Sequence, residues 1–332
     1  MTANDRFKNT LGFKKPEGRL PMLEWAFWWD KTYRRWQDDG LPSDVGIDGL
    51  QDYFGLDHLV CVAVKNFSDG FPRAKYHGGP VITGEESYAE VRKLLFSADS
   101  IGKTVGELKK IKDRHAAGEI SVWLWLDGFF WFPRSLFGIE GHLLSFYDHP
   151  GLLGRINGEL ASHYERALEA VYEVLVPDMV GFAEDMSYNH GPMLSRAAFD
   201  EFLLPYYRRI IPILKSNGSK VFIDSDGDVT QMIPWLLEAG ADGIFPLERQ
   251  AGVDVVKIRE AYPNLLVMGA FDKMTMIRGE EAMRAEFERL FPVMRQGGFI
   301  PACDHQTPPE VSLSNYKIYI RLLGEYCARA VE

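Results

Sequence analysis

Short apolar runs alternate with longer amphipathic segments through the second half of the chain. The apolar runs occupy residues 179–183, 220–223, 243–247, 265–269 and 299–302. Each is followed by a helical pattern, over residues 195–214, 229–239, 253–261, 280–295 and 313–328. Ser195 is a typical N-cap, and Gly240 is a typical residue to end a helix. Short, fully apolar strands between helices predict a parallel sheet that is covered on its faces.

The first half is less regular. We expect strands at residues 20–26, 58–64 and 121–126. Residues 65–120 form an irregular insertion between early strands, with helices expected at 87–96 and 105–117. Because no linker, repeat or low-complexity segment divides the chain, we expect residues 1–332 to form a single domain.

Polar and reactive residues follow the strands instead of preceding them. This placement is typical of a TIM-type barrel, whose chemistry lies at the C-terminal ends of its strands. A doubly wound open sheet shares the placement. The sequence contains no GxGxxG motif that would favour the dinucleotide-binding form of such a sheet.

Composition and charge exclude several classes of protein. The net charge is -10 and the basic residues are scattered, so we expect neither a nucleic-acid-binding face nor adhesion to anionic membranes. No apolar run approaches the length of about 18 residues that a membrane helix requires. The N-terminus is polar, and the three cysteines form neither a CxxC pair nor a disulfide framework. We therefore expect a cytoplasmic protein.

Acidic residues stand at the ends of most of the later strands. They are Glu184, Asp185, Asp224, Asp226, Glu248 and Asp272, and Cys303 and His305 follow the last strand. In a closed barrel these side chains converge on one mouth, where a shared divalent metal would relieve their repulsion. Two carboxylates and a histidine suit zinc or iron. The alternative is that such residues cap the following helices, as we expect for Asp228.

Cys303 and His305 are two positions apart on an extended end, so they are expected to point the same way while Asp304 points elsewhere. They suit a pair of metal ligands, or a nucleophile with its base. The alternative for Cys303 is a buried structural thiol. Core packing explains His305 poorly, because it lies in a polar loop.

Substrate contacts are expected from two regions. Met186, Tyr188 and His190 lie on the loop after residues 179–183 and could orient a substrate. Trp25 and Trp125 lie in aromatic-rich segments at expected strands. Such rings belong to the core of most proteins, but at strand ends they could line a flat apolar pocket.

The second half of the chain resembles the uroporphyrinogen decarboxylase superfamily over about residues 175–325. The resemblance is carried by Glu184-Asp185, residues 195–207, Ile223-Asp224-Ser225-Asp226-Gly227, residues 236–243, Pro246-Leu247-Glu248, Gly269-Ala270-Phe271-Asp272-Lys273 and residues 297–309. It implies an α/β fold of the (β/α)8 barrel type.

The superfamily includes two chemistries. True decarboxylases carry an arginine-rich N-terminal motif that binds the carboxylates of the substrate. Here Arg19 is the only arginine among residues 19–28, which disfavours decarboxylase activity. The other branch comprises methyltransferases that exchange a methyl group with a corrinoid protein. Members that act on coenzyme M bind zinc through a His-x-Cys motif, whose two places are occupied here by Asp224 and Asp226.

The Asp-Ser-Asp-Gly form is more similar to the branch that removes methyl groups from methoxylated compounds. The resemblance then implies zinc held by Asp226, Glu248 and His305, with Cys303 as an optional ligand. Glu184, Asp185, Asp224 and Lys273 become the catalytic candidates. A corrinoid would be supplied by a partner protein, and a homodimer is expected by analogy. The alternatives are a decarboxylase for a different acid and a non-catalytic ligand-binding barrel.

Overall fold

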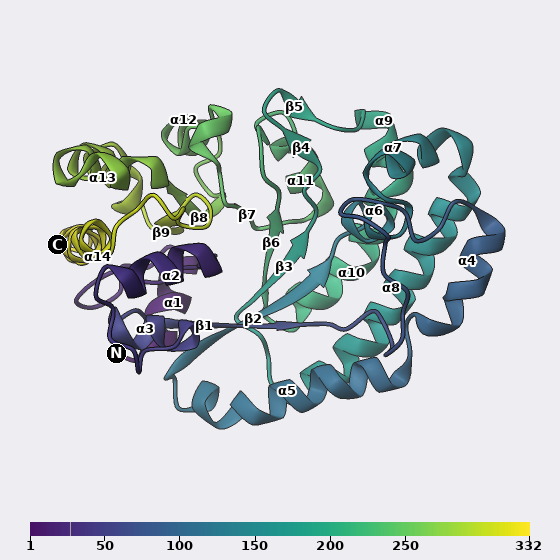
Figure 1. Ribbon diagram of the computed structural model, residues 1–332, viewed down its shortest axis with the longest axis horizontal. Helices are drawn as coiled ribbons and strands as arrows, with labels where there is room; N and C mark the ends of the chain where they lie inside the picture. Colours follow the sequence, from purple (N-terminus) through teal and green to yellow (C-terminus); the bar gives the residue numbers. More distant parts are fainter. Residues whose placement is uncertain (27) are drawn as a thin grey trace.

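The computed structural model describes residues 1–26 and 28–332. Its centre is a curled, seven-stranded sheet in the order β1-β2-β3-β6-β7-β8-β9, in which every pair of neighbours is parallel (Figure 1). The strands are β1 (His58–Ala63), β2 (Ile120–Asp127), β3 (Met179–Ala183), β6 (Lys220–Asp224), β7 (Gly243–Phe245), β8 (Leu266–Phe271) and β9 (Phe299–Cys303). The short strands β4 (Ser187–Tyr188) and β5 (Gly191–Pro192) form a separate antiparallel hairpin.

Helices surround the outside of the sheet (Figure 1). The first half contains α1 (Ala3–Leu11), α2 (Asp30–Asp38), η1 (Ile47–Gly49), α3 (Leu50–Tyr53), α4 (Glu85–Val91), η2 (Arg92–Leu94), α5 (Ala98–Ala116), α6 (Trp131–Phe137), α7 (Ile139–Asp148) and α8 (Pro150–Tyr172). The second half contains α9 (Arg196–Phe202), α10 (Leu204–Ser216), α11 (Ile233–Ala239), η3 (Arg249–Ala251), α12 (Val255–Ala261), η4 (Lys273–Arg278), α13 (Glu280–Met294) and α14 (Leu313–Arg329). The predicted (β/α)8-type barrel class is confirmed.

The first expected strand, residues 20–26, is wrong as a strand. The segment is irregular and lies where an eighth strand would stand between β9 and β1. The Asp57 N–H donates to the Met22 carbonyl at 2.6 Å, and the Trp25 indole N–H donates to the Cys303 carbonyl at 2.7 Å. Pro21 has no N–H to donate, and the Met22 N–H is bound by the Asp57 carboxylate at 2.9 Å. The segment therefore closes the barrel largely through side chains instead of a regular ladder.

Two hydrophobic layers follow from the alternation of residues along the strands. Residues such as Leu59, Phe222 and Ile300 form an interior cluster, which also receives Phe7 and Leu11 from α1. Their neighbours along the strands face the helices and belong to the larger outer core. Alternation therefore decides which strand-end side chains reach the barrel interior and which lie under the helices.

Local signals explain several helix boundaries. The Ser195 hydroxyl accepts the Ala198 N–H at 3.1 Å, and Gly240 ends α11 with φ +102°, so both predicted caps are confirmed. The expected helix over 195–214 is divided into α9 and α10 near Leu203, just before Pro205. Within residues 65–120, the 19-residue helix α5 packs on β1 and β2. In the described part of the chain, no helix combines the length and the apolar character of a membrane span.

Candidate functional site

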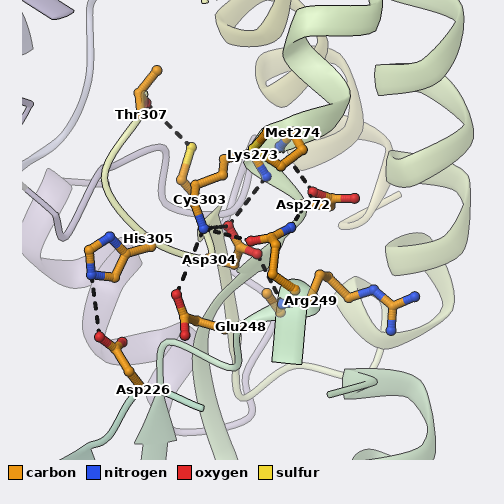
Figure 2. Close-up of polar contacts among 12 residues, drawn as sticks. Asp226, Glu248, Arg249, Asp272, Lys273, Met274, Cys303, Asp304, His305 and Thr307 are labelled. Carbon is orange, nitrogen blue, oxygen red and sulfur yellow. Dashed lines mark hydrogen bonds and ion pairs between the residues drawn. The ribbon is translucent and has the colours of Figure 1, made fainter. Parts of the chain in front are cut away.

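Three side chains from three strand ends meet at the C-terminal mouth of the barrel. Asp226 follows β6, Glu248 follows β7 and His305 follows β9. One potential ligand atom from each lies within 4.8 Å of the other two, and His305 Nε2 is 3.4 Å from Asp226 Oδ2 (Figure 2). We call Asp226, Glu248 and His305 the mouth triad. The structure thus brings together the three residues that were expected to bind a metal.

Backbone geometry holds the Asp226 loop against its neighbours. The Gly227 N–H donates to Glu248 Oε2 at 3.1 Å. Gly227 has φ +81°, and a Cβ there would lie 2.7 Å from the backbone of Tyr188. Only glycine allows the loop to pass so close to the β4–β5 hairpin while keeping this bond.

The donor set of the mouth triad fits a metal such as zinc. Carboxylate oxygen and imidazole nitrogen both bind zinc at about 2.0–2.2 Å. The three side chains are partly exposed, and their donor atoms lie close enough for small rotations to bring them onto one ion. The hydrogen bond from His305 to Asp226 raises the pKa of the imidazole. The negative charges of Asp226 and Glu248, which stabilise the protonated imidazole, would also stabilise a metal cation bound at the mouth triad.

Two further carboxylates, Asp185 and Asp224, lie beside the mouth triad. Asp224 shares the inward face of β6 with Phe222, and burial, followed by the nearby charges of Asp185 and Asp226, raises its pKa well above the usual range. Burial and the charge of Asp226 also raise the pKa of Asp185, whose backbone has φ +43°. A non-glycine residue in this conformation is strained and is held there by its surroundings. Both groups are therefore placed to hold a proton at the mouth.

Glu184, predicted to be catalytic, is instead directed toward the helix layer. It is buried, and its carboxylate accepts the N–H groups of Phe129, Phe130 and Trp131 at 2.9, 2.8 and 3.2 Å. The Tyr207 hydroxyl also donates to it. Burial raises the pKa of Glu184 to about 7 in spite of these bonds. The carboxylate anchors the start of α6, so the capping interpretation holds for this residue.

Cys303 is not in the mouth triad, so its expected role as a metal ligand is wrong in this structure. Ile300 faces the interior, which turns Cys303 to the outer face of β9. Its sulfur lies 3.4 Å from Glu24 Oε1 and 3.9 Å from Thr307 Oγ1, pointing away from the Asp226–His305 pair (Figure 2). Burial and the charge of Glu24 raise the pKa of the thiol well above its usual range. A thiolate, the form that binds metals, is disfavoured there.

Other predicted residues take different places. Met186 is fully buried in the outer core, so it does not face a substrate at the mouth. Tyr188 and His190 are exposed on the β4–β5 hairpin, with ring centroids 5.7 Å apart. The Asp272 carboxylate accepts the Met274 N–H at 2.9 Å and caps η4. Asp228 accepts the Thr230 N–H at 3.0 Å, but α11 begins only at Ile233 with Met232 at its N-cap, so the expected capping of that helix by Asp228 is wrong.

An aromatic cavity of about 380 Å³ opens beside His305. Its walls are Trp25, Ala26, Cys61, Ala63, Trp123, Trp125, His305 and Gln306. Trp25 and Trp125 therefore line a cavity, and His305 belongs both to this cavity and to the mouth triad. A flat, mostly apolar ligand suits this lining.

Two larger cavities lie away from the mouth triad. One, of about 440 Å³, includes Phe13, Lys220 and Tyr262 and lies at the end of the barrel where the strands begin. The other, of about 520 Å³, includes Tyr76 and Phe137 near α6 and α7. None of the described residues that line them belongs to the mouth triad, so size alone does not select the site.

Arg19 lies at the opposite end of the barrel from the mouth. Its guanidinium binds the Asp57 carboxylate at 2.6 and 2.9 Å, and Asp57 directly precedes β1. Arg6 joins the same carboxylate at 3.1 Å. Arg19 is therefore engaged in closing the barrel and is not placed to bind a substrate at the mouth.

A model of the uroporphyrinogen decarboxylase (URO-D) family matches residues 145–326, which is more than half of the chain. The chain belongs to the URO-D family. A methyltransferase from Methanosarcina mazei has a similar fold, with a TM-score of 0.63 and 13% identity over 98% of this chain and 99% of that one. A B12-independent methionine synthase from Shewanella sp. W3-18-1 has a TM-score of 0.43 and 13% identity over 68% and 65% of the two chains. The β-glycosidase of Thermosphaera aggregans has a TM-score of 0.43 and 9% identity over 88% and 84%. A search of curated proteins gives no match.

Sequence reasoning missed two buried carboxylates of this URO-D family member. Glu24 accepts the Tyr319 hydroxyl at 2.6 Å and the Cys303 N–H at 3.1 Å, and burial raises its pKa to about 7. Asp304 has a fully buried side chain and binds Lys273 at 3.2 Å. The sequence offered one signal for Asp304, which is its position directly before His305 at a strand end. A carboxylate buried among other strand ends needs a cationic or hydrogen-bonding partner, because an unpaired buried charge is costly.

Proposed function

We propose that the protein is a methyltransferase that moves a methyl group from a small methoxylated compound to a corrinoid carried by a partner protein. The observation that supports this most strongly is His305, which joins the carboxylate-rich mouth triad to the aromatic cavity. The cavity would hold the apolar body of the substrate and present its methoxyl group to the triad. URO-D family membership and the fold shared with a methyltransferase agree with the proposal.

The reaction requires help at the ether oxygen. The carbon–oxygen bond of the methoxyl group breaks, the methyl carbon bonds to the reduced cobalt of the partner, and the oxygen gains a proton. An ether oxygen is a poor leaving group, so a proton donor or a Lewis acid must stabilise it. A zinc ion on Asp226, Glu248 and His305 would act as that Lewis acid. Asp185 and Asp224 lie close enough to the triad to hold or deliver the proton.

The alternative decarboxylase activity is less well supported. A substrate with many carboxylates needs a cationic clamp, but Arg19 is bound to Asp57 at the other end of the barrel. At the mouth, the carboxylates of Asp226 and Glu248 would repel such a substrate. The electrostatics thus favour a neutral or weakly charged compound.

Methyl transfer can be tested directly. The purified protein is mixed with cob(I)alamin and a panel of methoxylated aromatic compounds, and methylcobalamin absorbance is followed. We expect methylation with at least one compound and release of the matching phenol in equal amount. The Asp226→Ala protein is the control and should be inactive. If no compound reacts, even with a cognate corrinoid protein, the proposed function is wrong.

The aromatic cavity makes a separate prediction about substrate affinity. Because Trp125 forms part of its wall, Trp125→Ala should raise KM by about tenfold, the effect of losing about 1.4 kcal/mol of apolar contact. Tyr188→Ala is the matched control, since Tyr188 is half-exposed and is not among the residues that line the cavity. Its KM should stay within about twofold of the wild type. Steady-state kinetics decides, and equal effects of both changes would contradict the placement of the substrate in the cavity.

A further inference from the structure

Asp304 links three neighbouring strand ends through one buried carboxylate. It directly precedes His305 at the end of β9, and its side chain is fully buried. The carboxylate accepts the Arg249 N–H at 3.0 Å and the Lys273 N–H at 3.3 Å, and it binds Lys273 Nζ at 3.2 Å. Arg249 follows the end of β7 and Lys273 follows the end of β8. One side chain therefore joins the exits of β7, β8 and β9 (Figure 2).

Two members of the mouth triad are adjacent in sequence to this carboxylate or to its partners. His305 shares a peptide bond with Asp304, and Glu248 shares one with Arg249. Lys273 Nζ also lies 3.8 Å from Glu248 Oε1 and donates to Gln250 Oε1 at 2.7 Å. The lysine therefore lies between the buried aspartate and a triad carboxylate. A displacement of Asp304 would be transmitted to both Glu248 and His305.

The backbone before Glu248 needs such support. Leu247 has φ +62°, which is a strained conformation for a branched residue and persists only where the surroundings hold it. The bond from the Arg249 N–H to Asp304 fixes the chain two residues later. Without the bond from the Arg249 N–H to Asp304, the backbone after β7 would lose a fixed point next to the strained Leu247. Glu248 lies between Leu247 and Arg249, so its side chain would lose its fixed position.

We infer that Asp304, with Lys273 as its counter-charge, is a positioning residue that holds Glu248 and His305 in the arrangement needed to bind a metal. This inference rests on the metal site of the proposed function. Groups that orient metal ligands without touching the metal commonly change metal affinity by about 10–100-fold. Asp304 does so here by fixing the peptide units on either side of the site.

Cobalt binding tests the inference without requiring activity. Co²⁺ is titrated into metal-free wild-type and Asp304→Asn proteins, and the affinity and the visible absorption spectrum of bound Co²⁺ are recorded. Asparagine keeps the size of the side chain but loses its charge and one acceptor oxygen. We expect Co²⁺ to bind about 10–100-fold more weakly to Asp304→Asn, with an altered spectrum that reports a changed ligand geometry.

Asp178→Asn is the matched control for a general loss of stability. Asp178 is also buried and bound to backbone, since it accepts the Val122 N–H at 2.7 Å and the Asn4 amide at 2.7 Å. It directly precedes β3, so it lies at the opposite end of the barrel. Its substitution should lower the melting temperature but leave the Co²⁺ affinity and spectrum within about twofold of the wild type. If Asp304→Asn does not fold, Asp304→Ser takes its place in the titration.

The possible results separate the inference from the proposed function. If folded Asp304→Asn binds Co²⁺ with the affinity and spectrum of the wild type, Asp304 does not position the triad, while the metal site stands. An equal loss in Asp178→Asn would also overturn the inference, because the effect would then be one of stability. If the wild-type protein binds neither Co²⁺ nor Zn²⁺, the metal site and this inference are both wrong.

Discussion

Asp226→Ala and His305→Ala are each expected to abolish stoichiometric zinc binding and to lower methyl transfer by more than about 100-fold. Each change removes one of three converging ligand atoms, and the two that remain cannot define the site. Elemental analysis of the purified proteins measures the metal, with about one zinc per chain expected in the wild type. Circular dichroism confirms that the variants are folded, as we expect because both side chains are partly exposed.

Cys303→Ser is the control that separates the two sets of candidate ligands. Because the Cys303 sulfur contacts Glu24 and Thr307 on the outer face of β9, this variant should keep its zinc. Zinc retained by both alanine variants, or lost from Cys303→Ser alone, would show that the metal is bound elsewhere. A folded wild-type protein without metal after purification and zinc supplementation would remove the metal from the proposed function.

The barrel was predictable from the sequence because its strands are buried on both faces. Such strands are short and continuously apolar, and the runs at 220–223 and 299–302 agree closely with β6 and β9. The same pattern misled at residues 20–26. An apolar segment that closes the barrel buries Leu23 just as a strand would, but Pro21 has no N–H to donate and the Met22 N–H is bound by the Asp57 carboxylate instead of a neighbouring strand. An apolar run indicates that a segment is buried, but it does not indicate whether the backbone of that segment forms the hydrogen bonds of a sheet.

The candidate site was predictable only in part, for a reason that lies in the same strands. Convergence of strand ends placed Asp226, Glu248 and His305 together, as expected. The sequence did not predict whether each strand-end side chain points into the barrel or toward the helices, because a uniformly apolar strand does not reveal which of its residues face the interior. Once Ile300 is known to face inward, alternation turns Cys303 outward, and Glu184 similarly follows the outward residue Phe182 by two positions.

The anchoring of Glu184 gives the largest expected effect on stability. In Gly128→Ala the new Cβ would lie 1.9 Å from Glu184 Cδ and 2.1–2.2 Å from both carboxylate oxygens. The carboxylate would have to leave three backbone N–H groups and the Tyr207 hydroxyl without their acceptor. We expect the free energy of unfolding to fall by about 3–5 kcal/mol, since buried donors that lose a shared acceptor are costly.

Urea denaturation measures the effect of Gly128→Ala, and Gly102→Ala provides the matched control. Gly102 is an exposed position within α5, where a Cβ would meet nothing within 4 Å. Alanine favours a helix over glycine, so this control should leave the free energy of unfolding unchanged or raise it by up to about 1 kcal/mol. A Gly128→Ala protein as stable as the wild type would mean that the Glu184 carboxylate does not need its place against α6. We would then have no physical reason to exclude Glu184 from the reacting groups at the mouth, because we exclude it on the ground that its carboxylate is fully occupied by backbone N–H groups at the start of α6 and by Tyr207.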